Sequence, residues 1–321
     1  MRRRDFITLF GGAAAMSPLT AHAQQRTRRI GLMANLRLPP IERFRQRLAQ
    51  LGYVEGKNLI IEYRFGEGRD DRFASFAAEL VAMPVEVIVV WGNPAAFAAK
   101  HATTTIPILI GAAGDVVNTG LIENISRPES NLTGFVALNV ELEAKRLELL
   151  KEVIPQLSRV AVLGTSANPL SRVNLDTARR SAERLGVTIE AFEVKNSAEV
   201  GDALARVTAS RPDAALLASD TLLLSERKRI TEAFAASHIP AIYPFKEYAE
   251  GGGLFIYGAN LSILFERAAD YLDRLLKGEK PGDLPVQQAT AFEFIVNLRT
   301  ARELGLKIPP SVLVRADEVI E

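Results

Sequence analysis

Two asparagine–proline pairs follow apolar runs in this sequence, and their positions could bind an anion. The pairs are Asn93-Pro94 and Asn168-Pro169, and each precedes a stretch with a helical pattern. Asparagine is a good N-cap, and proline is favoured at the first helical position. Each pair therefore predicts a helix whose N-terminal amides and positive dipole end could receive a carboxylate. Simple helix capping would explain both pairs equally well.

Acidic and aromatic residues follow other apolar runs. Asp115 comes directly after Gly114, where the missing side chain lets the backbone approach a ligand closely, and Asp220 ends a later run. Asp115 could accept a hydrogen bond from a ligand ammonium group, or it could cap the next turn. The aromatic residues at comparable positions could form the walls of a site for a planar ligand or pack in the core: they are Trp91, Tyr243 and Phe245.

The sequence gives little support to catalysis. Beyond residue 23 it contains two histidines, His101 and His238, and it contains no cysteine at all. This excludes a Cys-His pair, thiolate zinc sites and disulfides. The Gly-x-Ser-x-Gly and phosphate-loop motifs are also absent, and no residue pattern calls for a cofactor or metal. Spacing alone leaves a pair of catalytic carboxylates open.

Apolar, strand-like runs alternate with helical patterns along most of the chain. This alternation predicts an α/β fold of doubly wound parallel sheets, and the length predicts two domains. We expect strands at 29–35, 58–65, 85–92, 106–113, 159–165, 187–194, 214–220, 239–243 and 253–257. We expect helices at 41–51, 70–83, 94–101, 119–125, 141–154, 169–185, 200–210, 222–237, 245–250 and 262–276.

The first 23 residues have the layout of an export signal. Three arginines precede a short apolar stretch, and Ala21-His22-Ala23 resembles a cleavage site. The adjacent arginines before Phe6 suggest the twin-arginine route, although the general secretory route stays open. Without residues 1–23 the chain carries a net charge of −1, so it has no general attraction to nucleic acid or anionic lipid. We therefore expect a periplasmic protein without membrane insertion after cleavage.

Several phrases along the chain resemble one family, the substrate-binding proteins of ABC transporters in the type I periplasmic-binding-protein class, tryptophan/tyrosine type. These phrases are Arg3-Arg4-Asp5-Phe6-Ile7, Gly52-Tyr53-Val54-Glu55-Gly56-Lys57-Asn58, Ile61-Glu62-Tyr63-Arg64, Lys145-Arg146-Leu147-Glu148-Leu149-Leu150, Ile239-Pro240-Ala241-Ile242-Tyr243-Pro244-Phe245, Leu276-Lys277-Gly278-Glu279-Lys280-Pro281 and Arg315-Ala316-Asp317-Glu318-Val319-Ile320-Glu321. The resemblance extends from the signal to the C-terminus.

The resemblance implies two lobes that close on a small molecule and a membrane permease as partner, with ATP hydrolysed by another subunit. We expect lobe 1 to contain 27–135 and about 261–286, and lobe 2 to contain 136–260 and about 287–321, joined by a hinge with several crossings. The ligand-binding residues expected in the cleft are Asn35, Trp91, Gly92, Asn93, Gly114, Asp115, Thr165, Ser166, Asn168, Asp220, Tyr243 and Phe245. Relatives often have a proline after the Gly-Asp pair, where this chain has Val116.

The expected ligand is an amino acid, with an aromatic one as the first choice and other small carboxylates as alternatives. We expect a monomeric receptor without enzymatic activity, nucleic-acid partner or cofactor. Three other functions could use this fold. A transcriptional repressor would need a DNA-binding module where this chain has its signal, whereas a periplasmic sensor or a hydrolase with a carboxylate pair remains an alternative.

Overall fold

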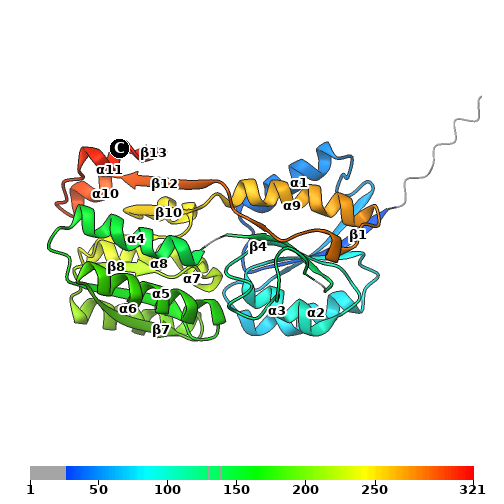
Figure 1. Ribbon diagram of the computed structural model, residues 1–321, viewed down its shortest axis with the longest axis horizontal. Helices are drawn as coiled ribbons and strands as arrows, with labels where there is room; N and C mark the ends of the chain where they lie inside the picture. Colours follow the sequence, from blue (N-terminus) through cyan, green and yellow to red (C-terminus); the bar gives the residue numbers. More distant parts are fainter. Residues whose placement is uncertain (1–26, 129, 138) are drawn as a thin grey trace, which may run out of the picture.

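The computed structural model describes residues 27–128, 130–137 and 139–321, so the predicted signal at residues 1–23 lies outside the described residues. Two β-sheets lie side by side, each covered by helices on both faces (Figure 1). We call each sheet with its helices a lobe. The α/β fold with two mostly parallel sheets, predicted from the sequence, is confirmed.

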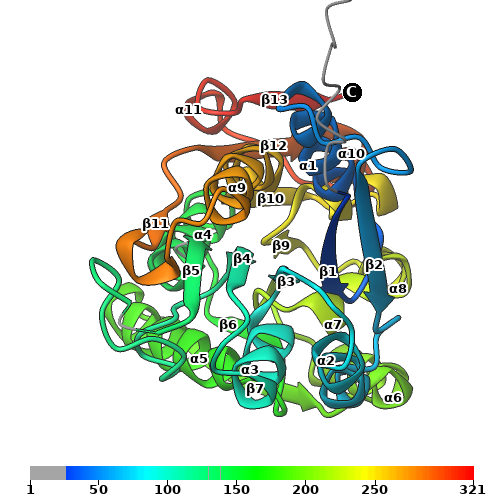
Figure 2. The same ribbon diagram turned by 90° about the vertical axis from the view of Figure 1, so that its right-hand side faces the viewer.

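Lobe 1 contains a six-stranded, fully parallel sheet in the order β11-β5-β4-β3-β1-β2. Its strands are β1 (Arg28–Ala34), β2 (Leu59–Phe65), β3 (Val87–Trp91), β4 (Ile108–Ala113), β5 (Leu132–Val136) and β11 (Gln287–Gln288). Its helices are α1 (Pro39–Gln50), the 3-10 helix η1 (Asp70–Arg72), α2 (Phe73–Val81), α3 (Asn93–Ala102), α9 (Leu261–Leu276) and η4 (Pro281–Asp283). Figure 2 shows α1 and α9 on one face of this sheet and α2 and α3 on the other.

Lobe 2 contains a seven-stranded sheet in the order β13-β12-β10-β9-β8-β6-β7, parallel except between β10 and β12. Its strands are β6 (Arg159–Thr165), β7 (Thr188–Val194), β8 (Ala214–Leu217), β9 (Ala241–Tyr243), β10 (Phe255–Ala259), β12 (Phe292–Asn297) and β13 (Glu318–Ile320). Its helices are α4 (Asn139–Val153), α5 (Pro169–Leu185), η2 (Ser197–Glu199), α6 (Val200–Ser210), α7 (Thr221–Ser225), α8 (Arg227–Ala236), η3 (Lys246–Gly251), α10 (Leu298–Glu303) and α11 (Pro310–Leu313).

Helix α9 anchors the late part of the chain on lobe 1. The ring of Phe265 packs edge-on against Trp91 and Phe44, with centroid separations of 5.3 and 6.4 Å. Gly111 in β4 makes this possible, because a Cβ there would come within 2.9 Å of the Phe265 ring. Burial of such aromatic side chains stabilises the contact by about 1.5–3 kcal/mol each.

Three connections between the sheets join the lobes: β5 to α4, β10 to α9, and β11 to β12. β11 pairs with β5 of the first sheet, so the last change of sheet falls between Gln288 and Phe292. The exact division of the chain into domains stays a prediction. Within the described residues, none of the helices has the length and apolarity needed to cross a membrane.

Some predicted elements differ from the structure. The helix expected near 119–125 is wrong, because 116–120 form turns in which Gly120 has a φ of +77°. The helix expected at 222–237 divides at Glu226 into α7 and α8. The sequence interpretation also missed β5 and the C-terminal elements from β12 onward, whose short apolar runs gain their strand character from pairing with distant strands.

Candidate functional site

A cleft separates the lobes at the carboxyl ends of their parallel strands, the usual ligand position in such sheets. Its outer part is a cavity of about 920 Å³. The walls are Asp70 and its neighbours, the α3 side chains Phe97 and His101, and a lobe 2 segment from Lys195 to Ala198. The space is large enough for an amino acid or another small molecule.

The inner part of the cleft is a narrow cavity of about 20 Å³, enough for a single water molecule. Seven of the predicted residues line it: Trp91, Gly92, Asn93, Gly114, Asn168, Asp220 and Phe245. The other lining residues are Ala112, Ala113, Ala137, Leu170, Ser219, Thr221 and Leu261. Both lobes thus contribute, as predicted for these strand ends, while the role of each residue in ligand binding stays a prediction.

The two asparagine–proline pairs differ in structure. Asn168 is the N-cap of α5, and its Oδ1 accepts a hydrogen bond from Leu170 N at 3.0 Å. In α3, however, Gly92 is the N-cap, so the predicted capping role of Asn93 is wrong. The Asn93 amide instead holds Gly114, donating to its carbonyl at 3.2 Å and accepting from its N–H at 2.8 Å. As a result, α3 begins beside the cavity without a side-chain cap.

Asp220 is buried at the strand tip and holds two helix starts together. Its Oδ1 accepts from Leu222 N at 2.7 Å and Leu223 N at 3.2 Å, which makes it the N-cap of α7. Its Oδ2 accepts from Thr165 Oγ1 at 2.8 Å and Asn168 Nδ2 at 2.7 Å. Thr165 therefore positions Asp220 by this hydrogen bond, and the four bonds together keep the carboxylate in a fixed position.

Asp70, which the sequence interpretation missed, lines the outer cavity, and one of its carboxylate oxygens is buried without a partner among the described residues. Asn35 Nδ2 donates to Asp70 Oδ1 at 2.7 Å, whereas Oδ2 is buried and has no hydrogen-bond partner within the described part of the chain. Burial, reinforced by the charge of Asp220, raises the pKa of Asp70 to about 7. Gly66 and Gly68 shortly precede Asp70, much as Gly114 precedes Asp115, and this pattern could have identified Asp70 from the sequence.

Asn35 connects this carboxylate to the other lobe. Its Nδ2 lies 3.1 Å from Thr221 Oγ1 in lobe 2, and its Oδ1 accepts from Gly68 N at 3.1 Å. Asn35 thus orders the loop after β2 and bridges the lobes. It is 1% exposed, so both contacts are shielded from water.

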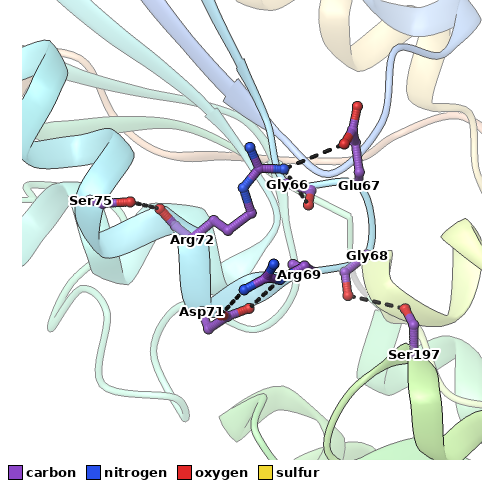
Figure 3. Close-up of polar contacts among 8 residues, drawn as sticks. All are labelled: Gly66, Glu67, Gly68, Arg69, Asp71, Arg72, Ser75 and Ser197. Atoms are coloured by element: carbon purple, nitrogen blue, oxygen red, sulfur yellow. Dashed lines mark hydrogen bonds and ion pairs between the residues drawn. The ribbon is translucent and has the colours of Figure 1, made fainter.

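The loop from Gly66 to Arg72 makes a second contact between the lobes (Figure 3). Ser197 Oγ in lobe 2 donates to Gly68 O at 3.1 Å. Within the loop, Arg69 pairs with Asp71 at 2.8 Å and Arg72 with Glu67 at 3.4 Å. These exposed pairs contribute little to stability, so the loop's position depends mainly on the Asn35 and Ser197 contacts.

Five predicted site residues line neither part of the cleft: Asn35 and Thr165, which bond Asp70 and Asp220, and also Tyr243, Asp115 and Ser166. Tyr243 is 2% exposed and its ring stacks on Tyr248 at 4.7 Å, and burial raises its pKa. Asp115 accepts hydrogen bonds from Asn118 N at 2.9 Å and Nδ2 at 2.6 Å, which is the turn-capping alternative. Ser166 is exposed, and its N–H donates to Val194 O at 2.9 Å. Trp91 has both roles, because it packs on Phe265 and also lines the inner cavity.

No group of three histidine, cysteine or acidic side chains among the described residues is arranged to hold a metal ion. Helix α3 places His101 next to Phe97 at the outer cavity, with ring centroids 6.2 Å apart. The polar groups of the cleft are therefore suited to hydrogen bonding and charge recognition.

Several known proteins are similar to this chain in sequence and fold. The tyrosine-binding protein of Clostridioides difficile is 24% identical over 288 residues, which are 88% of this chain and 82% of that protein. A crystal structure of a conserved domain protein from Vibrio cholerae has a TM-score of 0.86 at 26% identity, covering 92% of this chain and all of that one. A Streptococcus pneumoniae ABC domain in complex with L-Trp has a TM-score of 0.82 at 26% identity, covering 91% of this chain and all of that one. The profile of the ABC transporter substrate binding proteins matches residues 40–320. The chain belongs to the ABC transporter substrate binding protein family.

Proposed function

We propose that this protein is the periplasmic receptor of an ABC importer and that it captures an amino acid, preferably an aromatic one, between its lobes. The observation that carries this proposal is the unpartnered carboxylate oxygen of Asp70 at the cleft, close to the uncapped start of α3. Two relatives support the ligand class, since one is described as a tyrosine-binding protein and the other was crystallised with L-Trp.

Asp70 is the acceptor for the ligand ammonium group in this proposal. Its Oδ2 has lost its hydration without gaining a donor, and an ammonium group supplies both a donor and a compensating charge. The fixed carboxylate of Asp220 nearby adds to the attraction, as its effect on the pKa of Asp70 indicates. Binding of the ammonium group therefore favours the ionised form of Asp70.

The start of α3 is the acceptor site for the ligand carboxylate. Pro94 has no N–H, and Gly92 has no side chain that could cap the remaining amides of the first turn. A carboxylate at such a position is stabilised by about 0.3–2 kcal/mol. Thr221 lies between this helix start and Asp70. A Cβ atom on Gly92 would lie 3.1 Å from the Thr221 methyl group. Thr221 Oγ1 accepts a hydrogen bond from Asn35, which also bonds Asp70. The two charged groups of one α-amino acid match these neighbouring sites.

An aromatic side chain would extend into the outer cavity, where Phe97 offers a ring surface. The inner cavity is much smaller than an aromatic amino acid. We propose that the lobes separate for entry and release by rotation about the three connections between them. The contacts of Asn35 with Thr221 and of Gly68 with Ser197 would form on closure. The proposal also includes export of the protein to the periplasm, a monomeric receptor, and delivery of the ligand to a membrane permease.

Isothermal titration calorimetry of the purified protein with L-tryptophan and L-tyrosine tests the proposal. We expect saturable binding, together with weaker binding of tryptamine and indole-3-propionate, which lack the carboxylate and the ammonium group respectively. Asp70→Asn should weaken amino-acid binding about tenfold or more, because a charge-assisted hydrogen bond contributes about 1.5–3 kcal/mol.

Asp115→Asn is the matched control, because Asp115 is another aspartate in a glycine-containing loop of lobe 1, but it bonds within its own turn. Its affinity should stay within about twofold of the original protein. Absence of binding across all twenty amino acids would reject the ligand class. Equal losses in the two variants would reject the role of Asp70, and turnover of a bound compound would favour the hydrolase alternative.

A further inference from the structure

A second pocket between the lobes lies on the side opposite the mouth of the cleft. It has a volume of about 570 Å³, and we call it the hinge pocket. Lobe 1 contributes Pro39, Pro40 and Arg43 of α1, and lobe 2 contributes residues of η3, β12 and β13. Figure 1 shows α1, α9, β12 and β13 along the upper side, whereas α3, which borders the outer cavity, lies along the lower side.

The hinge pocket contains more acidic than basic side chains. Its charged residues are Glu247, Glu250, Glu293, Glu318, Arg43 and Lys246. Two of the acids have cationic partners, since Glu318 lies 2.6 Å from Lys246 Nζ and Glu250 lies 3.5 Å from Arg227. Among the described ion pairs, Glu247 and Glu293 have no such partner. Two carboxylates thus line this pocket outside the described ion pairs, with Lys246 as the nearby cation.

Glu247 is the more deeply buried of the two. The residue is 7% exposed, and its Oε2 lacks a hydrogen-bond partner in the part of the chain that the structure describes. Glu293 Oε2 accepts one bond, from Asn260 Nδ2 at 3.3 Å. Burial raises the pKa of Glu247, and it raises the pKa of Glu293 to about 7. Burying a carboxylate is unfavourable unless a donor or counter-charge compensates, so these oxygens are suited to a cationic donor.

We propose that the hinge pocket is a second binding site, for a small organic diammonium compound whose two N–H₃⁺ groups donate to Glu247 Oε2 and to the Glu293 carboxylate. A pocket of this volume suits a small organic molecule. A metal ion fits less well, because the described residues offer no group of three acidic or histidine ligands. Arg43 is exposed to solvent. The residues of this site differ from those proposed to bind the amino acid in the cleft.

Binding in the hinge pocket would act on the arrangement of the lobes. Asn260, which bonds Glu293, is the N-cap of α9 and lies in the connection from β10 to α9. The pocket walls come from both lobes, so a ligand that contacts them contributes free energy only in the arrangement that forms the pocket. The hinge pocket is therefore placed to regulate opening of the cleft.

The test is a calorimetric titration of the purified full chain with putrescine at constant ionic strength. We expect saturable binding that Glu247→Gln weakens about tenfold or more, the loss typical of a charge-assisted hydrogen bond. Glu293→Gln should weaken it as well and serves as the second variant if Glu247→Gln fails to fold by circular dichroism. Asp70→Asn, which alters only the cleft, should leave the affinity within about twofold.

Tetramethylammonium is the matched ligand control, because it carries a positive charge but has no N–H donor. It should not compete with putrescine. The proposal is overturned if putrescine does not bind, if Asp70→Asn abolishes binding while the glutamate variants retain it, or if tetramethylammonium competes at equal concentration.

Discussion

Gly68 lies where the loop of lobe 1 touches lobe 2, and an alanine at this position tests whether that contact holds the lobes together. The residue has a φ of +78°, and a Cβ there would lie 2.5 Å from Ser197 Oγ and 2.7 Å from Ser225 Oγ. Both serines belong to lobe 2. Gly68→Ala therefore places a methyl group in the interface between the lobes while the rest of the loop keeps its sequence.

The size of the effect follows from the two hydroxyl groups. Each serine can rotate away from the methyl group, but Ser197 then loses its bond to Gly68 O and Ser225 its bond to Leu222 O, which are 3.1 and 2.6 Å long. A hydrogen bond contributes about 0.5–1.5 kcal/mol net, so the contact between the lobes loses about 1–3 kcal/mol. This corresponds to about a 5- to 150-fold shift of the population towards separated lobes.

Gly120→Ala is the matched control. Gly120 has a φ of +77°, and a Cβ there would meet nothing within 4 Å. Both variants carry the same backbone strain of about 1–2 kcal/mol, which lowers the thermal stability of both. Only Gly68→Ala should also raise the radius of gyration in small-angle X-ray scattering and weaken amino-acid binding by the factor above.

Equal scattering curves and equal affinities for Gly68→Ala and Gly120→Ala would refute this reasoning. The contact of Gly68 with lobe 2 would then have no influence on how the lobes are arranged, and the closing motion would depend on other contacts.

Two further predictions concern buried charges. Burial raises the folded-state pKa of Asp70 to about 7, so the folded protein binds more protons than the unfolded chain between about pH 4 and 7. The protein therefore loses stability as the pH rises through this range. In urea unfolding, Asp70→Asn should be more stable than the original protein at pH 8, with little difference at pH 4. Arg146 and Glu143 form an ion pair at 2.9 Å with both side chains fully buried, and Arg146 Nε also donates to Tyr257 O at 2.7 Å. Arg146→Met should lower the free energy of unfolding by about 3–5 kcal/mol at pH 8. It should lower it less at pH 6, because burial raises the pKa of Glu143 to about 7 and the isolated carboxyl group can take up a proton; an equal loss at both values would contradict this account.

Local sequence signals predicted many parts of the cleft. Asn168 is the N-cap of α5, Pro169 is its first residue, and Asp220 is the N-cap of α7. The sequence can indicate such positions because a capping side chain bonds amides only two or three residues further along the chain. Alternating strands and helices predicted the α/β fold, since each element's apolar pattern is local. Trp91, Gly92 and Gly114 were selected because they lie at strand ends, and all three line the inner cavity.

Longer contacts decided what those residues do. Gly114 permits close approach of Leu170 from the other lobe, since a Cβ on it would lie 2.2 Å from that side chain. Tyr243 follows the same strand-end rule as Phe245, yet its ring turns into the core onto Tyr248. Strand position alone does not fix the direction of a side chain, because the packing of neighbouring elements selects it.

The sequence by itself determined the fold class, the positions of most helices and strands, and the loops that reach the cleft, because these depend on local periodicity and capping. Only the tertiary structure decided that Asn35 bonds both Asp70 and Thr221, residues 35 and 186 positions away. It also decided that Asp70 keeps an unpartnered oxygen and that Glu247 and Glu293 share a pocket with α1. Charge burial and contacts between lobes arise from residues far apart in the chain, so no local pattern records them.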